Sequence, residues 1–96
     1  MTTKKQPPAD PNLTILLRGK VRDVMTALPP GRKATRAMID DAIRVVFGYS
    51  DAKDDQISAA IEWNHERNLI DYHYNHDADR DEWFLTERGK AKEGIK

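Results

Sequence analysis

Three basic side chains that could bind phosphate stand close together in the sequence. Arg32 and Lys33 precede the expected start of a helix, and Arg36 lies in its first turn. The free backbone N–H groups and the dipole at a helix start also favour an anion there. This group is therefore the best phosphate-binding candidate in the chain, and Lys4 and Lys5 could follow a groove of a nucleic acid. Alternatively, all five side chains are solvated and serve only solubility.

An acidic run near the C-terminal end is the strongest candidate for a metal site. Residues 77–81 alternate aspartate with other residues, as in the first half of a calcium-binding loop. Glu82, however, occupies the position where such a loop requires glycine, and Arg88 occupies the position of the bidentate glutamate. Two of the three histidines are not spaced to share a strand face, and the third belongs to an expected helix, which argues against zinc. The sequence therefore predicts no metal site.

Motifs of the common enzyme classes are missing from the sequence. The chain has no glycine-rich phosphate loop, no nucleophile turn and no pair of carboxylates in an apolar setting. It has no cysteine, which excludes disulfides, thiolate metal sites and cysteine nucleophiles. The sequence therefore predicts neither an enzyme nor a cofactor-binding protein.

The length and composition limit the chain to one small domain. Its 96 residues can form one modest core, and 33% of them are charged. No run of apolar residues approaches the ~20 that span a bilayer, and the N-terminus lacks the apolar segment of a signal peptide. We therefore expect a soluble protein without membrane association, and the lack of cysteine fits the reducing cytoplasm.

The charges are balanced in number but uneven in distribution. Sixteen basic residues oppose 16 acidic ones, so affinity for a nucleic acid must come from where the charges lie. Residues 1–36 are basic, residues 40–82 are acidic, and basic residues return at the C-terminal end. The positions of the charged residues, rather than the net charge of the chain, therefore decide which partners it can bind.

Apolar residues at spacings of three and four predict three helices. The first is expected over residues 11–28, with Asp10 as its cap and Gly19 as its weak point. The second is expected to follow the cap Thr35 and to end at Gly48 in a left-handed conformation. A brief strand could form in the connection between these two helices.

The third helix is expected to start near Asp51 or Asp54, either of which could cap it, and to stop at Asn68. A short last helix should follow the cap Thr86 and run to about Glu93. The expected inward residues are Leu13, Leu16, Leu17, Val21, Val24, Met25 and Leu28 in the first helix, Met38, Ile39, Ala42, Ile43, Val46 and Phe47 in the second, and Ile57, Ala60, Ile61 and Asn64 in the third.

Residues 69–88 predict a β-hairpin, because two runs of strand-forming residues flank a polar tip. Alternate residues from Ile70 to Tyr74 fall on one face, and Trp83 and Leu85 supply the matching face of the returning strand. A single hairpin is marginally stable in water, so the three helices must cover its apolar face.

The order of these elements predicts the fold class. We expect an α+β domain over residues 11–94, with a three-helix core, a C-terminal hairpin and a short final helix. Residues 1–10 carry two lysines, two prolines and little to bury, so we expect a flexible arm there.

Four segments of the chain follow one known pattern. They are Val46-Phe47-Gly48 at the end of the second helix, Ile57-Ser58-Ala59-Ala60-Ile61 in the third, Asn68-Leu69-Ile70 at the start of the hairpin, and Trp83-Phe84-Leu85-Thr86-Glu87-Arg88-Gly89 at its end. Over residues 13–89 the sequence resembles the winged helix-turn-helix superfamily of DNA-binding proteins, in which the hairpin is called the wing. The matching positions are mostly packing and cap residues, so the resemblance identifies a fold rather than a subfamily.

The resemblance implies that the third helix lies in the major groove of double-stranded DNA and that the wing meets the neighbouring backbone. By position, Gln56 would bond to adenine, Lys53 to a phosphate or guanine, and Ser58 to either. The implied DNA-contacting residues are Arg32, Lys33, Arg36, Lys53, Gln56, Ser58 and Ala59. The implied function is a small regulator of transcription, and a homodimer is possible because many relatives are dimeric.

The third helix differs from most reading helices in being acidic rather than basic. Acidic groups that face phosphates lower the affinity for DNA. The alternative hypothesis is therefore a winged-helix module that binds a protein partner through this helix and the wing, with Asp55, Glu62 and Trp63 at the contact. A purely structural role for Trp63, packed under the wing or against the first helix, is the competing interpretation.

Overall fold

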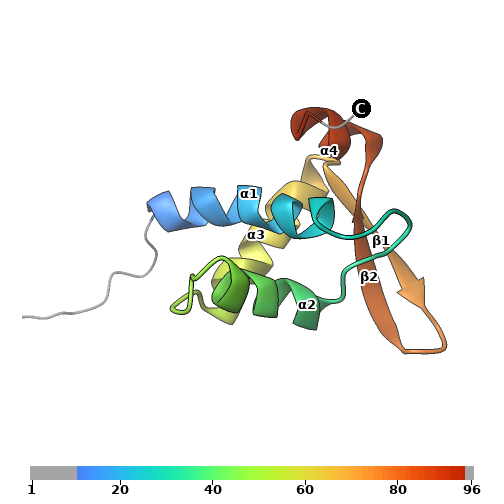
Figure 1. The fold of residues 1–96 in the computed structure, drawn as a ribbon, viewed down its shortest axis with the longest axis horizontal. Coiled ribbons are helices and arrows are strands. Elements are labelled where there is room, and N and C mark those ends of the chain that lie inside the picture. Colours follow the sequence, from blue (N-terminus) through green and yellow to red (C-terminus); the bar gives the residue numbers. More distant parts are fainter. Residues whose placement is uncertain (1–10, 95–96) are drawn as a thin grey trace, which may run out of the picture.

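A computed structural model describes residues 11–94 of the chain. In chain order its elements are α1 (Pro11–Thr26), α2 (Arg36–Asp41), η1 (Ala42–Val46), α3 (Asp54–Glu66), β1 (Ile70–Asn75), β2 (Arg80–Leu85) and α4 (Glu87–Lys92). Helices precede a two-stranded antiparallel hairpin and a short final helix, which confirms the expected α+β fold (Figure 1). The arrangement is that of a helix-turn-helix core with a β-hairpin wing. The expected arm and the expected cap Asp10 lie outside the described residues.

The core forms mainly where α1 packs against α3. Leu17 and Val21 of α1 and Ile57 and Ala60 of α3 are fully buried, as their spacing predicts. Burial of these side chains is the main force that holds the two helices together. None of the helices in residues 11–94 has the length and apolar character needed to cross a bilayer.

The second helical segment changes geometry along its length. Thr35 caps α2 as expected, because its side-chain oxygen accepts a hydrogen bond from a backbone N–H of the first turn at 3.1 Å. The segment continues as the π-helical turn η1, in which the Phe47 N–H donates to the Ala42 carbonyl oxygen at 2.9 Å. Gly48 follows with a φ of 84°, the left-handed stop that the sequence predicts.

Three side chains that we expected on the inward stripes are instead exposed. They are Leu16 (49% exposed), Met38 (37%) and Val46 (72%). The wider turn of η1 changes the direction of the side chains within it, so Val46 at its end faces solvent although its spacing fits a regular α-helix. The wrong prediction for Val46 therefore follows from assuming 3.6 residues per turn throughout, whereas Met38 precedes η1 and is exposed on the regular helix α2.

The start of α3 lies where the sequence places it, but its cap is different. The helix begins at Asp54 with Lys53 as the capping residue, so the expectation of an aspartate cap is wrong. Gln56 reaches back instead, and its Oε1 accepts a hydrogen bond from the Lys53 N–H at 2.9 Å. Asp54 and Asp55 occupy the first turn, where negative charge suits the helix dipole. Asn68 adopts a φ of 61° beyond the helix end, as expected.

The hairpin has the register that its alternation predicts. Ile70 pairs with Leu85, and Tyr72 pairs with Trp83. The first pair is buried at the root of the hairpin, whereas Tyr72 is 43% exposed because the outer half extends beyond the helices (Figure 1). Ala34 exchanges two backbone hydrogen bonds with Trp83, at 2.8 and 2.7 Å, and forms an isolated β-bridge where a brief strand was expected between the first two helices.

The final helix closes over the root of the hairpin. Thr86 caps α4, as expected, by accepting a hydrogen bond from the Gly89 N–H at 3.0 Å. The Thr86 N–H in turn donates to the Leu69 carbonyl oxygen at 3.1 Å. These bonds tie the exit of β2 to the entry of β1.

Candidate nucleic-acid interface

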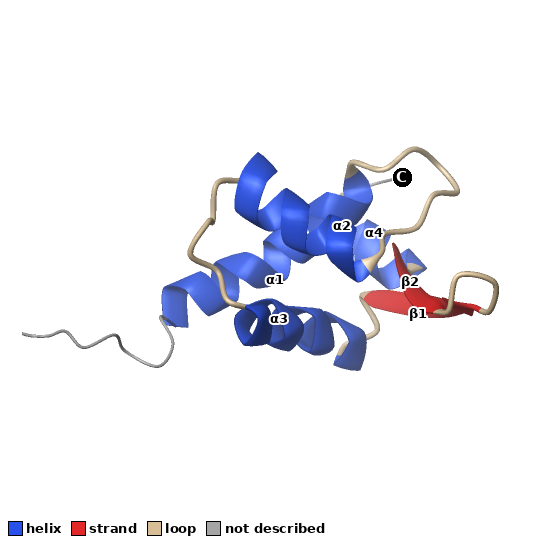
Figure 2. Ribbon diagram, turned by 90° about the horizontal axis from the view of Figure 1, so that it is seen from below, coloured by secondary structure: helices blue, strands red, loops and turns tan. Residues whose placement is uncertain are grey.

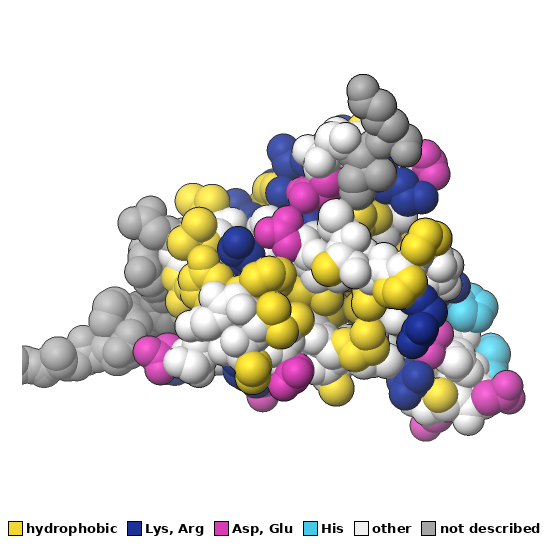
Figure 3. Space-filling view, viewed as in Figure 1, with side chains coloured by type: hydrophobic (Ala, Val, Ile, Leu, Met, Phe, Trp, Pro, Cys, Tyr) yellow, Lys and Arg dark blue, Asp and Glu magenta, His cyan; other side chains and the backbone are white. Residues whose placement is uncertain are grey.

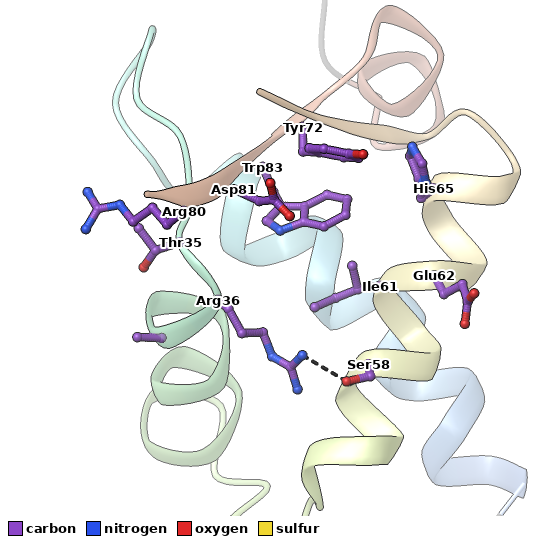
Figure 4. A pocket seen from close by; sticks show the side chains of 11 residues that line it. Thr35, Arg36, Ser58, Ile61, Glu62, His65, Tyr72, Arg80, Asp81 and Trp83 are labelled. Atoms are coloured by element: carbon purple, nitrogen blue, oxygen red, sulfur yellow. Dashed lines mark hydrogen bonds between the residues drawn. The ribbon is translucent and has the colours of Figure 1, made fainter. Parts of the chain in front are cut away.

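An open groove of about 740 Å³ lies between α2, α3 and the hairpin, and we call it the wing groove (Figure 4). Thr35 and Arg36 of the α2 start form one wall, and Ser58 and Glu62 of α3 form the other. In Figure 4, Arg36 reaches across toward Ser58, and aromatic rings close the end of the groove. The groove therefore joins the three elements that the sequence connects with DNA binding.

Aromatic side chains from α3 and both strands pack together at the hairpin end of the wing groove. The ring centroids of His65, Tyr72 and Trp83 are 4.9–5.7 Å apart, in tilted or edge-to-face arrangements. The Nε2 atom of His65 is also 3.5 Å from Oδ1 of Asp71. These contacts fix the hairpin to the end of α3. Sequence reasoning missed His65 and Arg80 as lining residues, because only the packing of the hairpin against the end of α3 brings them to one groove.

Arg36 is held by two side chains and one backbone carbonyl of the domain rather than left free for a ligand. Its Nε donates to Asp40 Oδ1 at 2.7 Å and its Nη1 donates to Ser58 Oγ at 2.8 Å. Its Nη2 donates to the Asp54 carbonyl oxygen at 2.9 Å. Arg36 and Ser58, both predicted DNA contacts, therefore bond to each other and connect α2 to α3.

A second arginine connects η1 to the start of α3. Arg44 donates from Nε to the Ala52 carbonyl oxygen and from Nη2 to Asp54 Oδ1, each at 2.8 Å. The hydrogen bond from Arg44 lowers the pKa of Asp54, and the same bond raises the pKa of Arg44. The pair is exposed to solvent, and it closes the turn between the two helices.

Replacing Arg44 with glutamine is expected to raise the pKa of Asp54 towards the usual value of about 4. In the wild type the carboxylate stabilises the fold above its unfolded-state pKa, and this contribution is lost as the pH falls through the lower folded-state pKa. An NMR titration of the Asp54 carboxyl carbon measures the shift. Arg80→Gln, which removes a cation on the hairpin, is the control; identical Asp54 titrations in wild type and Arg44→Gln would contradict the ion pair.

The other predicted contacts on α3 lie at its exposed start. Lys53 is exposed at the cap, and Ala59 is exposed one turn into the helix. Gln56 uses its Oε1 for the cap, so only its amide nitrogen is left to donate to a base edge. Bidentate recognition of adenine by Gln56 would require the cap to open.

The three cations that we grouped as phosphate anchors do not share one site. Arg36 lines the wing groove, whereas Arg32 and Lys33 line a second groove together with Lys90 of α4. Figure 2 shows the loop between α1 and α2 on the side of the domain away from α3. The expected cluster is therefore divided between two faces.

The outward side of α3 is acidic in the structure, as in the sequence. Asp55, Glu62 and Glu66 are exposed, and within residues 11–94 none of them has an ion-pair or hydrogen-bond partner through its side chain. Acidic side chains also gather at the tip of the hairpin, while apolar side chains spread over α1 and α2 (Figure 3). The outward side of α3 and the tip of the hairpin therefore both present negative charge.

The side chains of Trp63 and Glu62 line different grooves, although the hypothesis of a protein partner places both at one contact. The guanidinium carbons of Arg18 and Arg67 are 4.5 and 4.2 Å from the centroid of the Trp63 ring. Trp63 lines a shallow groove next to α1 with Ile15, whereas Glu62 lies at the edge of the wing groove. This placement agrees with the competing interpretation, in which Trp63 packs against the first helix.

Comparison of the chain with protein families, with curated proteins and with solved structures found no match. Within the part of the chain that the structure describes, no three His, Asp or Glu side chains come together in a way that could hold a metal ion. The candidate site therefore depends on the wing groove, the start of α3 and their charges.

Proposed function

We propose that this chain is a winged-helix protein that binds double-stranded DNA, with α3 as its reading helix, and that it acts in transcription regulation. The observation that supports this proposal is the helix-turn-helix arrangement itself. The outward side of α3 is exposed, and the hairpin projects next to it beyond the helical core (Figure 1). A duplex that received α3 in its major groove would meet the wing on the adjacent backbone.

The contacts in this proposal follow from the side chains that remain available. Lys53, exposed at the positive end of the α3 dipole, would bind a phosphate. Gln56 would donate from its amide nitrogen, and Ala59 would make an apolar contact with a thymine methyl group. Arg36 would reach a phosphate only by exchanging its bond with Ser58. Arg32 and Lys33 have no part in this mode of docking.

Replacing Glu62 with lysine is expected to tighten duplex binding about tenfold at 0.1 M salt, because the variant exchanges repulsion for one phosphate contact. Fluorescence anisotropy with labelled duplex fragments measures the Kd. Glu87→Lys makes the same charge change on α4, and the Kd of this variant for the duplex should change much less. Lys53→Gln should weaken binding by a similar factor.

Two results would contradict DNA binding through α3. One is no binding of the wild type at low salt beyond that of an unrelated neutral protein. The other is an equal gain from Glu62→Lys and Glu87→Lys, since that would mean the gain depends on total charge and not on the face that meets the duplex.

The second candidate function is binding of a basic protein partner through α3. The observation that favours it is the set of exposed acidic groups on this helix, Asp55, Glu62 and Glu66, which have no partner within residues 11–94. Charge attraction would make the complex sensitive to salt. For this function Glu62→Lys should reduce partner capture in a pull-down, the reverse of its effect on duplex binding. Unchanged capture would exclude α3 as the contact.

A further inference from the structure

A second groove, of about 570 Å³, lies between the C-terminal end of α1, the loop that follows it, β2 and α4, and we call it the loop groove. Apolar side chains line it, among them Leu28, Pro29 and Phe84. Arg32 and Lys33 also line it, together with Lys90. The loop groove thus combines an apolar floor with a basic rim, and it has no residue in common with the wing groove.

The rim cations are available to a ligand at little cost. The side chain of Arg32 has no hydrogen-bond or ion-pair partner within residues 11–94. The Lys33 ammonium lies 5.8 Å from the centroid of the Phe84 ring, and Lys90 is 3.5 Å from an exposed carboxylate of Glu87. Exposed pairs of this kind contribute little and exchange easily. Among residues 11–94 no aspartate or glutamate lines the groove, although Lys33 lies close enough to Glu82 to be attracted to that carboxylate.

The loop that carries the rim is held in place by its own backbone. Two prolines restrict it, and Gly31 takes a φ of 82° to close the turn. The Arg32 N–H donates to the Pro29 carbonyl oxygen at 3.0 Å, and Ala34 is paired to β2 by two backbone hydrogen bonds. A ligand would therefore meet a rim that is already ordered, which lowers the entropic cost of binding.

We propose that the loop groove binds an acidic segment of a partner protein in which Asp or Glu residues flank a leucine or phenylalanine. The apolar side chain of the segment lies on the floor, and the flanking carboxylates pair with Arg32, Lys33 and Lys90. This occupant satisfies both parts of the groove at once. The backbone of a nucleic acid satisfies only the rim, because it has no apolar group for Leu28 and Pro29.

The test is fluorescence anisotropy with a labelled nonapeptide in which Asp or Glu alternates with Leu or Phe. The wild-type chain should bind it with a measurable Kd, and Arg32→Ser combined with Lys33→Ser should raise the Kd about tenfold, because two ion pairs are lost. Arg88→Ser combined with Lys92→Ser removes the same charge from α4 outside the groove and should change the Kd less than twofold. A second peptide, with serine in place of Leu and Phe, should bind at least tenfold more weakly.

Three outcomes would overturn the proposal: no binding of the first peptide, equal binding of the two peptides, or equal effects of the two double variants. A fourth outcome has two parts. Duplex DNA displaces the peptide from the wild-type chain, and the Arg32→Ser, Lys33→Ser variant loses as much affinity for the duplex as it does for the peptide. That result would assign the loop groove to nucleic acid. Failure of DNA binding through α3 leaves the peptide result unaffected, since Glu62→Lys and the loop variants change different faces.

Discussion

Replacing Arg22 with alanine is expected to lower the free energy of unfolding by about 3 kcal/mol. The Arg22 side chain connects α1, α3 and α4, because Nε donates to Glu93 Oε2 at 2.7 Å and Nη1 donates to Asn64 Oδ1 at 2.9 Å. Asn64 is fully buried, so loss of Arg22 leaves its Oδ1 without that partner and leaves a shielded carboxylate unpaired. Urea unfolding followed by tryptophan fluorescence measures the change.

Lys92→Ala is the matched control for Arg22, since it removes an exposed cation from the same end of the domain. Its effect on the free energy of unfolding should stay within about 0.5 kcal/mol. Similar unfolding midpoints for the two variants would mean that the network around Asn64 contributes nothing. The network also matters for the site, because the Asn64 Nδ2 donates to the Arg18 carbonyl oxygen at 3.0 Å and so fixes α3 against α1.

Replacing Gly89 with alanine is expected to cost about 3 kcal/mol or more and to lower the Tm by about 15 °C. A Cβ atom at this position would overlap the Leu69 carbonyl oxygen and lie 2.9 Å from the Leu69 carbonyl carbon. Backbone atoms cannot rotate away, so α4 would have to move off the root of the hairpin. Thermal unfolding followed by circular dichroism measures the change.

Gly19→Ala provides the opposite test at the other glycine within a helix. A Cβ atom there meets Arg22 Nη2 at 3.7 Å, an ordinary contact, and alanine favours the helix over glycine. We expect stabilisation by about 0.5–1 kcal/mol. If Gly89→Ala left the Tm unchanged or raised it, as is expected of Gly19→Ala, close packing of α4 on Leu69 would not be what requires Gly89.

The sequence by itself determined the order, the type and most boundaries of the elements. Thr35, Gly48, Asn68 and Thr86 act within one turn of their own helix ends, so their roles could be predicted from neighbouring residues. The register of the hairpin also follows from local alternation, because a shift by one residue would turn every apolar side chain to the wrong face.

The tertiary structure alone decided which charged side chains are free and which are engaged. Arg36 bonds to Ser58 across 22 positions, and Arg22 bonds to Glu93 across 71. Periodicity shows which side of a helix a residue occupies, but not which distant group lies within hydrogen-bond distance. Tertiary pairing also separated Arg32 and Lys33 from Arg36. Ala34, which lies between them, pairs with Trp83 of β2, and the adjacent β2 residues Trp83 and Phe84 line different grooves.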